Sequence, residues 1–139
     1  MTNHNNRQNV WMIAAFLMCF GAALSIGHAA TDDRDRVLKY LDTVTVPKFF
    51  VKGEMRDEVI KKLNQALHKA RPHTQIEIIF VPSPYYPSSK SDEARLAHSG
   101  YIDVDNCTVL QLMRVIGTMY AVDFKISGNK VVAVQGVYY

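Results

Sequence analysis

The chain begins with one long apolar run that a charged stretch follows directly. Residues 10–27 carry no charge, Arg7 precedes them, and small residues close the run. A charged start, an apolar middle and a small-residue end are the three parts of a secretory signal peptide. Because Gly27 and Ala29 suit the positions before the cleavage point, we predict a signal peptide over residues 1–30. The alternative is an uncleaved anchor formed by residues 10–27, whose length reaches the lower limit of a membrane span.

The first half of the remaining chain alternates between strand-like and helix-like spacing. The polar segment 31–45 contains a short predicted helix over 34–42, and the aromatic and β-branched residues Phe49–Val51 are typical of a strand. Apolar positions spaced by three and four then predict a helix from Met55 to Lys69. They are Met55, Val59, Ile60, Leu63, Ala66, Leu67 and Ala70. Lysines and amides occupy its other face, and Thr74–Val81 follows as a strand.

The second half repeats this order after a Pro/Ser/Tyr-rich insertion over 82–98. Gly100–Asp105 is a predicted strand, and Thr108 is a plausible cap of the next helix. The buried face of that helix is predicted to hold Val109, Leu112, Met113, Ile116 and Tyr120. Two strands, 122–127 and 130–134, are joined by Gly128-Asn129, a pair that suits a type II′ hairpin turn.

The predicted order is β-α-β, loop, β-α-β-β, which indicates an α+β fold with both helices on one face of a small sheet. We therefore divide the chain into a signal peptide (1–30), a polar segment (31–45) and one domain (46–139) with a loop insertion at 82–98. A length of 139 residues allows a single domain and little more.

Composition narrows the class of function without naming it. The chain is 48% hydrophobic and 21% charged, which excludes a disordered protein, and its net charge is only +3. The basic helix face that contains Lys61 and Lys62 is interpreted as solvated, so no nucleic-acid partner is predicted. Removal of residues 1–30 leaves Cys107 as a single thiol, and hence no internal disulfide.

Few residues suggest catalysis. Cys107 lies beside a predicted helix N-terminus, where the helix dipole lowers a thiol pKa, and His98 lies nearby in the sequence. A small exported thiol-dependent enzyme that uses Cys107 with His98 is therefore the alternative hypothesis. The favoured interpretation is a structural cysteine in a protein that is not an enzyme. Histidines and acids show no metal-ligand spacing and glycines form no phosphate loop, so neither a metal nor a cofactor is predicted.

Residues 101–134 carry the pattern of a known family. The marks are an Asn-x-Thr turn before the helix, paired apolar residues within it, and a closing hairpin. They fall on Asn106, Thr108, Val109, Met113, Ile116, Val122 and Phe124. The stretch resembles the secretin and TonB short N-terminal (STN) domains, and 46–63 is similar to the family's other strand–helix unit. Ala121 stands where the family usually has Gly, and Arg56 where a Leu often begins the first helix.

The resemblance covers about 46–134 and implies a non-enzymatic, periplasmic or cell-envelope domain that acts by contacting partner proteins. In the family such domains precede an outer-membrane barrel; pore formation is not carried over. The partner is expected to be another envelope protein or a second copy of the chain.

A small sheet has open edges, and strand addition to an edge is the binding mode that we expect. The favoured edges are Phe49–Val51 and Lys130–Val134, ahead of Thr74–Val81 and Tyr101–Asp105. The predicted partner-binding residues are Tyr85, Tyr86, Lys130, Val132 and Val134. If Lys130–Val134 is a free edge, Val132→Pro should abolish binding and leave the domain folded.

Overall fold

The computed structural model describes residues 31–83, 90, 94–95, 98 and 100–136. The predicted signal peptide and the tyrosines Tyr85 and Tyr86 lie outside the described residues. Residues 36–139 form one compact unit with its own core, and residues 1–35 are a separate unit. The compact unit therefore includes part of the polar segment 31–45.

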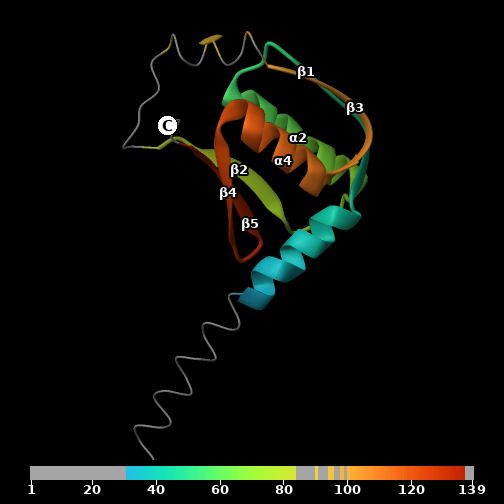
Figure 1. Ribbon diagram of the computed structural model, residues 1–139. Helices are drawn as coiled ribbons and strands as arrows, with labels where there is room; N and C mark the ends of the chain where they lie inside the picture. Colours follow the sequence, from blue (N-terminus) through green and yellow to red (C-terminus); the bar gives the residue numbers. More distant parts are fainter. Residues whose placement is uncertain (1–30, 84–89, 91–93, 96–97, 99, 137–139) are drawn as a thin grey trace, which may run out of the picture. The chain divides into compact units, whose positions relative to one another are not determined.

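The elements follow the predicted order. A helix over residues 31–43 precedes the strands and helices named in Figure 1. These are β1 (Thr45–Lys52), α2 (Arg56–Ala70), β2 (Glu77–Val81), β3 (Tyr101–Thr108), α4 (Val109–Tyr120), β4 (Val122–Ser127) and β5 (Lys130–Gln135). The predicted α+β class is confirmed.

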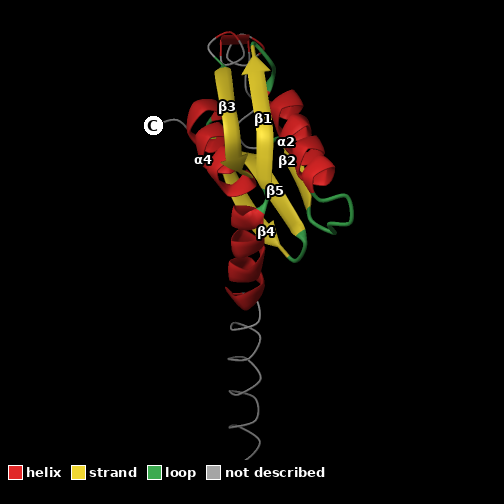
Figure 2. Cartoon of the chain, turned by 90° about the vertical axis from the view of Figure 1, so that its right-hand side faces the viewer, coloured by secondary structure: helices red, strands yellow, loops and turns green. Residues whose placement is uncertain are grey.

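The two helices α2 and α4 lie side by side between two sheets, as Figures 1 and 2 show. Strands β1 and β3 pair antiparallel as one sheet, and the other sheet has the order β2-β5-β4. Both helices pack on one face of the three-stranded sheet, as predicted. The division of the strands into two sheets was not predicted.

The core fills the space between these layers. Leu63, Leu67 and Ile116 are fully buried on the helices, and Val51 and Val131 are fully buried on opposite sheets. The 31–43 helix adds Val37 and Leu41 to the same core. These two residues are one turn apart and form a buried stripe on a mainly polar helix, and Tyr40 packs against the same core.

The prediction that Lys130–Val134 is a free edge is wrong. Strand β5 pairs in parallel with β2, where Ile79 lies opposite Val132, and antiparallel with β4, where Lys125 lies opposite Val132. The strand is therefore the centre of its sheet. Strand β2, which the sequence ranked as a less favoured edge, is at the border instead, together with β4. Phe49–Val51 does belong to a border strand, β1.

Local signals set the ends of α4. The Thr108 hydroxyl accepts a hydrogen bond from the Gln111 backbone N–H at 3.2 Å, and the Gln111 side chain accepts one from the Thr108 N–H at 2.9 Å. This reciprocal capping box satisfies two backbone donors and confirms Thr108 as the N-cap. At the other end, Ala121 adopts a left-handed conformation with φ 47° and ψ 61°. Glycine is the usual residue at such a cap, because it has no Cβ.

Replacing Ala121 with glycine is expected to stabilise the protein. The left-handed conformation costs an L-residue about 1 kcal/mol, which glycine does not lose. Ala121→Gly should therefore raise the free energy of unfolding by about 1 kcal/mol in urea denaturation. The matched control is Ala66→Gly inside α2, where the same change should lower it by about 1 kcal/mol. Equal signs for the two variants would contradict the strained cap.

Candidate interaction surface

Backbone groups at the borders of the two sheets are the first candidate site. In a border strand, the edge strand of a sheet, every second residue directs its N–H and C=O groups away from the sheet. Another strand can pair with these groups. Each of β1, β3, β2 and β4 has no strand on its outer side among the described elements. What fills these outer positions therefore decides where a partner can add a strand.

Helix α2 covers the outer side of β1. The Lys62 ammonium donates a hydrogen bond to the Phe50 carbonyl at 2.9 Å and forms an ion pair with Glu54. Gly53 N–H donates to Gly100 C=O at 3.0 Å, so Gly53 belongs to a hydrogen-bonded pair of the β1–β3 ladder. Because such pairs alternate along the strand, Phe50, three residues earlier, directs its carbonyl away from β3. The lysine thus occupies an acceptor that an added strand would need.

Helix α2 also covers the outer side of β2. The Asn64 side-chain oxygen accepts a hydrogen bond from the Ile78 backbone N–H at 2.8 Å. The Glu77 N–H faces β5 and donates to the Asn129 carbonyl at 3.1 Å, so the next N–H along the strand faces outward. Asn64 satisfies that outward donor. The sequence placed Lys62 and Asn64 on a solvated helix face, but both are half-buried and hold strand edges.

At the borders beside α4, no comparable cover is found among the described residues. Strand β3 presents Tyr101, Asp103 and Asp105 as exposed positions, and β4 presents Asp123 and Lys125. No hydrogen bond from an α4 side chain to the outer groups of β3 or β4 is found in the described part of the chain. Side chains of α2 therefore bond to the outer backbone groups of the strands beside it, and among the described residues those of α4 do not.

The exposed face of the β1–β3 sheet carries an aromatic and charged cluster. The rings of Phe50 and Tyr101 meet edge to face with centroids 6.0 Å apart, and they are 44% and 56% exposed. Lys48 forms ion pairs with Asp103 and, at 3.2 Å, with Asp105. The hydrogen bond from Lys48 lowers the pKa of Asp103, and the bonds to Asp103 and Asp105 raise the pKa of Lys48. The cluster gives this face two flat rings beside fixed charges.

Two polar side chains of the helices α2 and α4 are buried. Arg56 is only 2% exposed although it opens the helix, and Tyr120 at the end of α4 is fully buried. Burial, and then the charge of Glu54, raises the pKa of the Tyr120 hydroxyl. One sequence signal pointed to this environment, namely Arg56 at a position where the resembling family often has Leu. For Tyr120 the only signal was its predicted core position.

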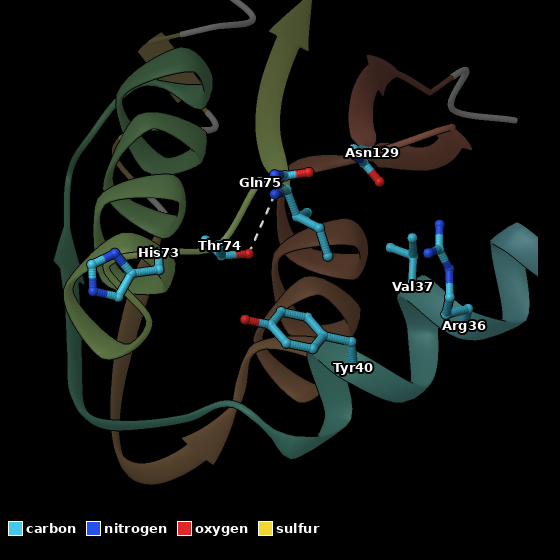
Figure 3. Close-up of a pocket in the computed structure, with 8 residues that line it drawn as sticks. Arg36, Val37, Tyr40, His73, Thr74, Gln75 and Asn129 are labelled. Atoms are coloured by element: carbon cyan, nitrogen blue, oxygen red, sulfur yellow. Dashed lines mark hydrogen bonds between the residues drawn. The ribbon is translucent and has the colours of Figure 1, made fainter.

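One pocket of about 280 Å³ opens between the 31–43 helix and the chain that enters β2. Figure 3 shows Arg36, Val37 and Tyr40 projecting from the helix and Thr74 and Gln75 lying on the loop opposite. The Thr74 hydroxyl accepts a hydrogen bond from the Ile76 N–H at 3.3 Å. Val37 and Ile76 provide an apolar floor, and no carboxylate is among the lining residues. Of the predicted site residues that the structure describes, Lys130, Val132 and Val134 are not among the lining residues of this pocket.

The predicted partner-binding residues that the structure describes share one strand, and the two residues of the alternative thiol site lie on other segments. Lys130, Val132 and Val134 lie on the central strand β5 with both ladders occupied. The Cys107 thiol is half-buried at the end of β3, packs against the core and donates to the Asp105 carbonyl at 3.7 Å. His98 is exposed in the part of the insertion that the structure describes.

The groups at the β4 edge were missed by the sequence analysis. Asp123 and Lys125 lie in the predicted strand 122–127, but their edge position follows only from the sheet order. Within the described residues, no group of three or more His, Cys, Asp or Glu is arranged for a metal ion. Among the helices that the structure describes, none combines the length and apolar character needed to cross a bilayer.

Comparison with known proteins gives no relative on which to base a function. No protein-family model, no curated protein and no solved structure matches the chain. The residues and their geometry are therefore the basis for inferring a function.

Proposed function

We propose that the chain is an exported, non-enzymatic interaction domain of the cell envelope that binds protein partners by strand addition at the borders beside α4. One observation carries the proposal. Lys62 and Asn64 of α2 occupy outward backbone groups of β1 and β2, whereas β3 and β4 have no such cover among the described residues. Covered borders prevent unwanted pairing, so selective cover favours recognition at the other two.

The resemblance to STN domains supports the same class of function. The order of elements fits that pattern, and Ala121 adopts the left-handed conformation at the position where the family usually has Gly. Asn106 also has a positive φ of 51°, two residues before the Thr108 cap. The apolar segment 10–27, outside the described residues, supports export.

The Cys107 environment favours a structural thiol over the alternative thiol-dependent enzyme. Its sulfur packs against the core and is engaged with a backbone carbonyl two residues earlier. A nucleophilic cysteine would need a base within hydrogen-bond reach, and the contact made by Cys107 is to a carbonyl oxygen.

Site-specific photo-crosslinking in intact cells tests the proposal. A photoreactive residue at Lys125 on β4 or at Tyr101 on β3 should give covalent protein adducts, because partner strands lie against these borders. The same residue at Glu77 on β2 or at Lys52 on β1 is the matched control. It should give at least about tenfold less adduct, since α2 occupies both borders.

Two results would contradict the proposal. One is equal adduct formation at all four positions, and the other is none at Lys125 and Tyr101. Sequencing of the accumulated chain checks its compartment. It should begin at Ala30 or Thr31, and an intact Met1 in the membrane fraction would instead indicate the anchor of residues 10–27.

A further inference from the structure

The outer side of β4 has an ordered set of free backbone groups. Gly136 N–H donates to Ala121 C=O at 2.7 Å, so these two opposed residues form a hydrogen-bonded pair. Hydrogen-bonded pairs recur at every second residue of an antiparallel ladder, so Asp123 and Lys125 also belong to such pairs with β5. Asp123 and Lys125 therefore direct their backbone groups toward β5. Val122, Phe124 and Ile126 direct theirs away from the sheet, where no described strand lies.

The side chains of β4 separate by face. Val122 is buried, and Phe124 and Ile126 are half-buried against the helices. Asp123 and Lys125 are exposed on the opposite face. The apolar residues Val122, Phe124 and Ile126 thus offer the outward backbone groups. Asp123 and Lys125 alternate with them along the strand.

We propose that a second copy of this chain pairs with β4 by antiparallel strand addition centred on Phe124. The inference rests on the proposed function and names one partner for the β4 border. Phe124 then lies opposite Phe124 of the second copy, and Val122 lies opposite Ile126 of the second copy. These pairs exchange backbone hydrogen bonds, and the two three-stranded sheets become one continuous sheet.

The charge pattern of β4 selects this register. With Phe124 at the centre, Asp123 lies opposite Lys125 of the second copy, and the symmetry of the pair repeats this contact. The two side chains occupy a non-hydrogen-bonded position, where opposed residues approach most closely. Moving the centre by one residue toward the N-terminus places Asp123 opposite itself. Moving it by one residue the other way places Lys125 opposite itself.

The other borders are less suited to a second copy. Strand β3 carries Asp103 and Asp105 and no cation, so antiparallel self-pairing brings its acids together. Strand β1 has its Phe50 carbonyl held by Lys62, and β2 has its Ile78 N–H held by Asn64. Among the described border strands without cover, β4 is the one in which an acid and a base alternate.

Charge reversal tests the contact directly. Sedimentation velocity over a concentration series of the full chain, in the form that accumulates in cells, should show a monomer–dimer equilibrium. Asp123→Lys and Lys125→Asp each place like charges opposite one another twice, so each should weaken dimerisation at least about tenfold. The double variant D123K/K125D restores opposite charges and should return the dissociation constant to the wild-type value within about twofold.

Glu77→Lys provides the matched control, because Glu77 is an exposed charge on the other border of the same sheet. It should leave dimerisation unchanged, and circular dichroism melting checks that every variant is folded. A wild-type chain that stays monomeric overturns the proposal, as does a dimer that withstands both single reversals, or one that Glu77→Lys weakens equally. A monomeric wild type leaves the proposed function intact if Lys125 or Tyr101 still crosslinks to another protein.

Discussion

Val132→Pro is expected to unfold the protein. Val132 lies on the central strand β5, where the even-numbered residues direct their N–H groups to β4 and Lys125 is the opposed residue. Proline removes this donor and leaves the facing carbonyl without its ladder bond. The lost bond and the unsatisfied carbonyl together cost about 3 kcal/mol or more, a large part of the stability of a small domain.

Urea denaturation followed by circular dichroism measures this effect, with Val132→Ala as the control. Alanine keeps the backbone N–H and removes only part of a half-buried side chain, so its cost should be about 1 kcal/mol or less. A Val132→Pro variant that folds with wild-type stability would contradict the central placement of β5. It would restore the free edge that the sequence predicted.

Ile116→Ala should also be strongly destabilising. Ile116 is a fully buried residue of α4. Helix α4 itself lies between the two sheets (Figure 2). Truncation removes buried methyl groups and leaves a cavity that a packed layer closes only in part. We expect a loss of about 2–5 kcal/mol in the free energy of unfolding.

The adjacent residue provides the control for this measurement. Val115 follows Arg114 on the outer face of α4 and is 38% exposed. Val115→Ala should change the free energy of unfolding by about 0.5 kcal/mol at most. Similar losses for the two variants would mean that α4 does not lie between two sheets with one face toward the core.

Local features of the fold were predictable because neighbouring residues in the sequence produce them. Apolar residues spaced three and four positions apart predicted α2 and α4, and the predicted ends differ from the observed ends by a residue or two. The Thr108 cap needs only Gln111 three residues later. The hairpin at Gly128 needs only a residue that accepts a positive φ, and Gly128 has φ 59°. Each of these signals acts between residues within one helical turn or one β-turn.

The sheet order was not predictable from the same kind of signal. The sequence of Lys130–Val134, one lysine followed by four apolar residues, is compatible with a strand at a border or in the centre. Its place depends on pairing with β2, which lies some fifty residues earlier and joins it in parallel. The energy of that contact comes from long-range backbone hydrogen bonds and from packing on α2, neither of which leaves a local mark.

The candidate site divides in the same way. Local sequence specifies the strand and helix segments, the places of Asp123 and Lys125 along β4, and the polar character of Lys62 and Asn64. Long-range packing brings Lys62 to β1 and Asn64 to β2, and it leaves β4 at a border without a further strand among the described residues. An edge depends on what lies beside a strand, and those neighbours come from distant parts of the chain.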